Sequence, residues 1–182
     1  IELRIVTRQG GPVPVELTAT PRIKQCVVER VSGVGRDISE RKQAEQKLRQ
    51  LLHAIEQSPA LVLITDAAAN IEYVNPKFSG VTGYSAAEVR GQNPRILKSG
   101  HRSPEEYREM WKTLESRGEW RGEFCNRKKN GDCFWVSATI SAIKDDSGSV
   151  TRFISLQEDI TERKRADAAL RESEQRFQAF MD

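Results

Sequence analysis

The sequence predicts an α+β fold with one five-stranded antiparallel sheet and short helices on one face. Two short extended segments come first, a helical block follows, and three long extended segments close the pattern, separated by the turn sequences NGD and DDSG. Turns of this kind between alternating segments are typical of β-hairpins. Strands gathered on either side of a helical block indicate an α+β fold rather than an alternating α/β fold.

The first two strands are predicted at LVLITD (61–66) and IEYVN (71–75), around the turn AAAN. Pro76 suits the first position of a helix, so PKFSGVTGY is predicted to form a short helical turn. A second short helix is predicted in SAAEVRG, with Ser85 as its N-cap and Gly91 as its C-cap.

A longer helix is predicted over EEYREMWKTLESRG. Ser103 can cap its amino end, Pro104 occupies the first helical position, and Gly118 closes it. Acidic residues early in the segment complement the positive end of the helix dipole.

Three long strands are predicted at EWRGEFCNRKK (119–129), CFWVSATISAI (133–143) and VTRFISLQED (150–159). Alternate residues of a strand point to the same face of a sheet. The residues of the first long strand that share one face are Trp120, Gly122, Phe124 and Asn126.

The chain contains an internal repeat. The helical part of the repeat is GRDISERKQAEQKLRQ, which reappears as QEDITERKRADAALRE and aligns Asp37 with Asp159. The extended part before it is TRQGGPVPVELTATPRI, which reappears as RKKNGDCFWVSATISAI and aligns Gly11 with Gly131. A fixed period of this kind indicates a tandem array, so the chain is predicted to be a piece of one. The predicted parts are the last strands of one copy (1–37), a linker helix (38–54), a complete copy (55–159), and an exit helix with the start of a third copy (160–182).

Several of these motifs, in this order, resemble the Per-Arnt-Sim (PAS) sensor domain. They are the strand pair, NPKFSGVTGYSAAEVRG, the turn NRKKNG and the closing DITER. The resemblance implies a pocket between the sheet and the helices that holds a small ligand or cofactor, or a domain that binds nothing and acts in dimerisation. It also implies an output module such as a histidine kinase or a diguanylate cyclase in the whole protein, with no catalysis by this chain itself.

The segment GQNPRILKSG resembles the corresponding loop of light-oxygen-voltage flavin domains and of redox-sensing flavin domains. Asn93, Arg95 and Leu97 match it, and the resemblance implies that Arg95 contacts a flavin phosphate, which suits the planar guanidinium. The cysteine that forms the flavin adduct in photosensors falls on Pro94, which excludes adduct photochemistry.

Three further positions match flavin contacts in those domains, and a fourth departs from them. Asn126 and Gln157 match amides at the ring, and an amide can both donate and accept. Trp111 matches a tryptophan beside the flavin, whereas Val136 replaces a second ring asparagine. The resemblance therefore implies FAD or FMN as a possible cofactor.

Each match also has a structural interpretation that stays open. Asn126 can serve its own strand and turn, Arg95 can be a solvated surface charge, and Trp111 can be a core anchor at helical spacing from Tyr107 and Leu114. A pocket that is empty, or that holds a different ligand, is the alternative to flavin.

The composition of the chain argues against several other functions. The 29 basic and 26 acidic residues are scattered through the chain, which argues against nucleic-acid binding. The longest apolar run, ALVLI, is far too short to span a membrane. Cys26, Cys125 and Cys133 lack metal-ligand spacing, so no metal is predicted and a cytoplasmic setting fits best. His101 and His53 match neither a haem ligand nor a phosphoacceptor.

Both linker helices carry a heptad seam, which predicts a homodimer through these helices. Its residues are Ala44, Leu48, Leu51 and Ile55 in the first helix, and Ala166, Leu170, Ser173, Phe177 and Phe180 in the second. An amphipathic helix lying against its own domain is the alternative. Because the helices start directly from the last strands, Asp37, Asp159 and Ile160 are predicted to relay a signal from pocket to helix. The two functions left open are a ligand or flavin sensor and a cofactor-free module for dimerisation and relay.

Overall fold

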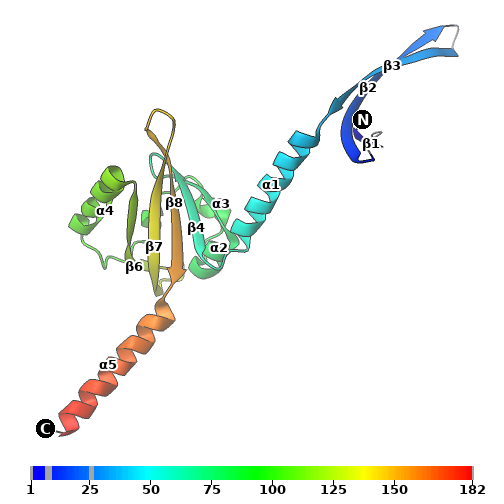
Figure 1. Cartoon of the computed structure of the whole chain (residues 1–182). Coiled ribbons are helices and arrows are strands. Elements are labelled where there is room, and N and C mark those ends of the chain that lie inside the picture. Colours follow the sequence, from blue (N-terminus) through cyan, green and yellow to red (C-terminus); the bar gives the residue numbers. More distant parts are fainter. Residues whose placement is uncertain (1, 7–9, 25–26, 182) are drawn as a thin grey trace. The chain divides into compact units, whose positions relative to one another are not determined.

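The computed structural model describes residues 2–6, 10–24 and 27–181, with side chains over 2–6, 10–22 and 28–178 (Figure 1). Cys26 and the side chain of Phe180, which belong to the cysteine count and the heptad seam, lie outside the described residues. The chain divides into two compact units, Ile1–His53 and Ala54–Asp182, and each is considered by itself.

The second unit contains the predicted five-stranded sheet, in the order β5-β4-β8-β7-β6, and every neighbouring pair is antiparallel. Its strands are β4 (Leu61–Asp66), β5 (Ile71–Val74), β6 (Glu119–Arg127), β7 (Cys133–Lys144) and β8 (Val150–Asp159). The α+β prediction is therefore confirmed. Strand β6 ends two residues earlier than predicted because Lys128 donates its N–H to the carbonyl of Asp132 and begins the turn.

Helices α2 (Pro76–Thr82) and α3 (Ala86–Val89), the 3-10 helix η1 (Pro94–Leu97) and helix α4 (Pro104–Arg117) connect β5 to β6. Helix α4 has the predicted caps, since the Ser103 side chain accepts from the N–H of Glu106 and Gly118 closes it. The predicted C-cap of α3 was wrong by one position, because Arg90 is the cap. Gly91 instead donates its N–H to the carbonyl of Ile71, which draws the chain away from the helix axis.

A fully buried amide fixes the corner where the chain leaves the sheet for the helices. Asn75 Oδ1 accepts from the N–H groups of Val62, at 2.9 Å, and Phe78, at 3.0 Å. Its Nδ2 donates to the carbonyls of Ala60 and Ile55. One side chain thereby joins the end of helix α1 (Ser39–Glu56), strand β4 and helix α2.

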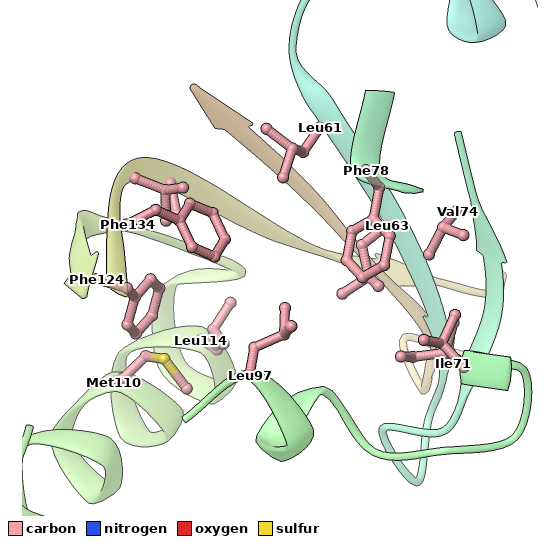
Figure 2. Close-up of a cluster of buried hydrophobic side chains, with 13 residues drawn as sticks. Leu61, Leu63, Ile71, Val74, Phe78, Leu97, Met110, Leu114, Phe124 and Phe134 are labelled. Atoms are coloured by element: carbon pink, nitrogen blue, oxygen red, sulfur yellow. The ribbon is translucent and has the colours of Figure 1, made fainter. Parts of the chain in front are cut away.

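The hydrophobic core lies between the inner face of the sheet and the helices, where side chains from both layers point toward one another (Figure 2). Phe78 and Leu114 are completely buried, and Phe134 is nearly so. Trp120 lies flat over Gly122 on strand β6, where a Cβ atom would come within 2.4 Å of the indole ring. The predicted common face of Trp120, Gly122, Phe124 and Asn126 is confirmed, since Trp120 packs against the core and Phe124 and Asn126 are buried.

The first unit is a three-stranded antiparallel sheet in the order β1-β2-β3. Its strands are β1 (Glu2–Val6), β2 (Pro12–Lys24) and β3 (Val27–Asp37). Val15 pairs with Asp37, as Val136 pairs with Asp159, so Val15 corresponds to Val136. The alignment of Gly11 with Gly131 is therefore one position off along β2, and a shift of one residue would reverse the faces of the strand.

Both linker helices begin with the same contacts. The N–H of Ile38 donates to the carbonyl of Pro14 at 3.0 Å, and the N–H of Ile160 donates to that of Trp135 at 2.9 Å. In α1, Asp37 Oδ1 accepts from the N–H of Ser39. In α5 (Thr161–Met181), Asp159 Oδ1 accepts from the N–H of Thr161. Each helix is thereby held to the second-last strand of its own sheet.

The seam side chains of the linker helices are largely exposed in this single chain. Leu48, Leu51, Leu170 and Phe177 each expose more than half of their surface. Apolar residues at heptad spacing that remain exposed can be covered by another helix. No helix in the described part of the chain is long and apolar enough to cross a membrane.

We predict that Asn75→Ala lowers the free energy of unfolding by about 3 kcal/mol, because it leaves buried backbone N–H and C=O groups without partners. Urea denaturation followed by circular dichroism measures the loss. Asn130→Ala, in the exposed turn after β6, is the matched control and should cost less than about 1 kcal/mol. Equal losses for the two variants would contradict a special structural role for Asn75.

Candidate functional site

A cavity of about 180 Å³ lies between the inner face of the sheet, the η1 segment and helix α4. Apolar side chains form most of its wall, among them Leu63, Leu97, Met110, Leu114 and Phe124. A mostly apolar pocket with a few convergent polar groups is the usual form of a small-molecule site. This cavity is therefore the candidate binding site of the domain.

Four buried polar side chains belong to the cavity wall: Thr65, Asn126, Ser155 and Gln157. Strand β8 supplies two of them because Ser155 and Gln157 are two residues apart and share its inner face. Ser155 pairs in register with Leu63 of β4 and with Ile140 of β7. The polar pair is therefore set into an apolar surface, where its hydrogen bonds are shielded from water.

Gln157 is the most informative of these residues. It exposes only 6% of its surface, and its Nε2 donates to Ser155 Oγ at 3.0 Å. Its Oε1 is buried and has no hydrogen-bond partner within the described residues. An unsatisfied buried acceptor costs about 1–3 kcal/mol. A ligand with a hydrogen-bond donor would remove this cost.

Asn126 contributes a second amide to the same cavity. It exposes 7% of its surface, and its backbone forms an isolated bridge with Lys98. Over the part of the chain that the structure describes, no hydrogen bond engages its side-chain amide. Asn126 can therefore both donate to and accept from a ligand.

Two cations stand at the mouth of the cavity, on and just after η1. Arg95 is exposed, and across the described ranges no acidic side chain forms an ion pair with it. Lys98 Nζ lies 3.8 Å from the centre of the Tyr107 ring. Burial raises the pKa of Tyr107, so its phenol remains a protonated donor at neutral pH. The mouth therefore suits a ligand with an anionic end.

Asn93 lies at the cavity, but both ends of its amide are engaged within the protein. Its Nδ2 donates to the carbonyl of Ala69 at 3.1 Å, and its Oδ1 accepts from the N–H of Arg95. Ala69 adopts a positive φ of 63°, which is unusual for a residue with a Cβ atom. Asn93 thereby holds the β4–β5 turn against η1.

Trp111 is not the core anchor that its helical spacing allowed. It remains 37% exposed and packs edge-to-face on Phe153, with 5.3 Å between ring centres, whereas Leu114 one turn further on is fully buried. Trp111 lines the cavity instead.

The structure brings together Asn93, Arg95, Leu97, Trp111, Asn126 and Gln157 around the cavity. Val136 is the exception: it is fully buried in the hydrophobic core, opposite Phe124, and is not part of the cavity wall.

Sequence reasoning missed Thr65, Ser155, Lys98 and Tyr107, which also line the cavity. The alternation of β8 could have indicated Ser155, because it shares a face with Gln157. Thr65 reaches the cavity because β4 pairs with β8, and the sequence of one strand does not show which strand it will pair with.

The fold and the cavity define an α+β domain in which helices cover a candidate binding site on one face of an antiparallel sheet. A family profile for the PAS domain matches residues 1–40 and 59–162, which is well over half of the chain. The chain belongs to the PAS family, whose members are sensory domains of signalling proteins.

A nitrogen fixation regulatory protein of Klebsiella oxytoca is 39% identical over 107 residues, which is 59% of this chain and 22% of that protein. The chain thus spans less than a quarter of the length of this relative. A light-oxygen-voltage domain solved in work on a flavin analogue is 29% identical, with a TM-score of 0.56 over 70% of this chain and 96% of that one. A PAS domain from Colwellia psychrerythraea has the same fold, with 22% identity and a TM-score of 0.60 over 64% of this chain and 98% of that one.

We predict that Gln157→Leu leaves the unfolding free energy of the ligand-free chain unchanged or raises it by up to about 1 kcal/mol, because the substitution removes an unsatisfied buried acceptor. Thr82→Val is the contrasting variant. Its hydroxyl donates to the carbonyl of Phe78 at 2.9 Å, so its loss should cost about 1 kcal/mol. A loss above about 2 kcal/mol for Gln157→Leu in urea denaturation would show that the amide is structural.

Proposed function

We propose that the domain at 55–159 is a sensor that binds FMN or FAD in its cavity and relays the state of the ligand to a downstream output domain. The observation that carries the proposal is the buried Oε1 of Gln157, which has no hydrogen-bond partner within the described residues and belongs to a side chain that lines the cavity together with Asn126. The similarity to a domain studied with a flavin analogue supports the choice of ligand class.

The residues of the cavity fit a flavin. Asn126 and Gln157 offer amides that can pair with the polar edge of the ring, while Leu63, Leu97 and Leu114 offer an apolar surface for its faces. Arg95 and Lys98 at the mouth suit the phosphate, and Arg95 can bind it with two parallel hydrogen bonds. A bound flavin supplies reversible electron transfer, and Pro94 leaves no thiol for adduct formation.

The relay follows strand β8 out of the cavity. Gln157 is two residues before Asp159, and Asp159 Oδ1 holds the N–H of Thr161 at the start of α5. The Trp135 N–H also donates to Thr161 Oγ1, and the Trp135 carbonyl accepts from Ile160. A change in the hydrogen bonds of Gln157 would therefore displace the strand end that holds the exit helix.

Strand β6 forms a second connection to the exit helix. The Glu123 carboxylate pairs with Arg163 and Lys164 of α5. These cations hold the pKa of Glu123 below its usual value, so the contact persists at neutral pH. Glu123 neighbours Phe124 in the cavity wall, so helix α5 contacts three of the strands that line the site, β6, β7 and β8.

The organisation of the chain extends the proposal. We infer that residues 1–37 are the last strands of a preceding PAS domain, 38–54 are a linker helix, and 160–182 are an exit helix that begins a third domain. The strand order β1-β2-β3, which matches β6-β7-β8, supports this division of the chain. The equivalent hydrogen bonds of Ile38 and Ile160, each to its own sheet, also support it. The output is expected to be a cytoplasmic histidine kinase or diguanylate cyclase domain.

Dimerisation and relay without a cofactor is the second candidate function. The exposed seam residues Leu48, Leu51, Leu170 and Phe177 favour it, because a second copy of the chain would cover them. The two functions are compatible, because a dimer formed through the linker helices could also transmit the state of a bound ligand.

The flavin proposal is tested by the near-ultraviolet and visible absorption spectrum of the purified chain, with analysis of any small molecule released by heat. We predict flavin bands, and about tenfold weaker binding after Asn126→Ala or Gln157→Leu, because each removes a buried hydrogen bond. Asn130→Ala is the control and should bind normally. A spectrum that stays featureless after addition of excess FMN and FAD would refute flavin binding, and a Soret band would show haem instead.

Self-association is tested by light scattering after size-exclusion chromatography. We predict a dimer for the native chain, and at least a tenfold weaker association for Leu170→Asp, because the new carboxylate would be buried in the helix seam. Gln175→Asp adds the same charge to α5 away from the seam and should leave the dimer intact. A native chain that is monomeric at high concentration would contradict the seam.

A further inference from the structure

Two thiols lie together on the outer face of the sheet, away from the cavity. Cys125 of β6 pairs in register with Trp135 of β7, and Cys133 lies two residues before Trp135. Residues two apart on a strand share a face, so Cys125 and Cys133 are diagonal neighbours on the same face. Diagonal neighbours across an antiparallel pair lie about 7–8 Å apart, so a disulfide between these two cysteines requires the paired strands to draw closer together.

The two thiols have different environments. The Cys125 thiol interacts with the Cys133 thiol and with Ser99, and both cysteines are free. Cys125 is buried, whereas Cys133 is exposed. Burial raises the pKa of the Cys125 thiol, so Cys125 remains protonated while Cys133 meets solvent. An accessible thiol beside a second thiol that can resolve a mixed disulfide is typical of redox-sensing cysteines.

We propose that Cys133 and Cys125 form a thiol redox site that reacts with small disulfides of the glutathione class. The Cys133 thiolate attacks one sulfur of the small disulfide, forms a mixed disulfide and releases one small thiol. The Cys125 sulfur then attacks the Cys133 sulfur, loses its proton and releases the second small thiol. The protein loses two electrons and two protons and gains one S–S bond, and the small disulfide is reduced to two thiols.

The surroundings of Cys133 admit such a reagent. Cys133 lines a groove between the β6–β7 turn and the start of α5, together with Lys128, Arg165 and Thr161. The two cations can attract the carboxylates of a glutathione-like molecule, although Asp132, Asp159 and Glu162 also border the groove and moderate this attraction. The groove is open to solvent, so the attacking sulfur can be reached directly.

The position of this pair connects it to the exit helix. Cys133 is two residues before Trp135, whose N–H and carbonyl hold Thr161 and Ile160. The Cys125 carbonyl accepts from the hydroxyl of Ser99, the residue after Lys98 at the cavity mouth. Oxidation of the pair would therefore act on the helix junction without a change of ligand, as an input separate from the cavity.

The experiment uses the whole chain, reduced and then exposed to oxidised glutathione, with remaining thiols blocked by N-ethylmaleimide before mass spectrometry. We expect native chain and Cys26→Ser alike to gain a Cys125–Cys133 cross-link and to lose two hydrogen masses. Cys125→Ser should stop at a mixed disulfide, one glutathione unit heavier, on Cys133. Cys133→Ser should leave Cys125 unmodified.

Three results would overturn the proposal: a cross-link that requires Cys26, a native chain that stops at the mixed disulfide on Cys133, or no reaction at either cysteine. Thermal melting by circular dichroism checks that each variant is folded. Where Cys125→Ser does not melt cooperatively, Cys125→Ala replaces it, because alanine introduces no hydroxyl into the buried site. The Cys26→Ser variant keeps both Cys125 and Cys133. Its cross-link therefore tests the proposal even if the variants of the pair do not fold.

Discussion

The buried amide of Asn75 is the interaction on which the architecture of the second unit depends. A primary amide inside a protein must find partners for its oxygen and its nitrogen, and Asn75 finds four, in the end of α1, the residue before β4, β4 itself and α2. These bonds set where the chain turns from sheet to helices. The helices then cover the inner face of the sheet and leave the cavity between the two layers.

Other side-chain amides of the domain differ in how many of their hydrogen bonds are made within the protein. Asn75 is completely satisfied and fixes structure, and Asn93 likewise uses both ends of its amide on neighbouring backbone. Within the described residues, Gln157 uses only its nitrogen, and the amide of Asn126 belongs to the cavity wall. Because an unsatisfied buried acceptor costs stability, the Oε1 of Gln157 favours a binding role for this side chain over a purely structural one.

Strands β6, β7 and β8 connect the cavity with the exit helix. Their inner faces carry Phe124, Ile140 and Gln157, which line the cavity, while Glu123, Trp135 and Asp159 of the same strands contact α5. The cysteine pair lies on the outer face of the same strands, beside that junction. A ligand in the cavity and an oxidant at the cysteine pair would therefore both act on the junction between these strands and α5. The equivalent contacts at Ile38 show that the chain uses this junction twice.

By itself, the sequence determined the strands, the turns and the caps of α4, because hydrophobic period, turn residues and capping residues act over a few neighbouring positions. Its motifs also indicated the PAS family and six residues of the cavity wall. It could not determine that Asn75 is the corner of the fold, that more than a third of Trp111 is exposed, or that Val136 belongs to the core. It also aligned the repeat one residue off along β2. Only the tertiary structure decided these points, because hydrogen-bond satisfaction, burial and strand register depend on atoms that distant segments bring together.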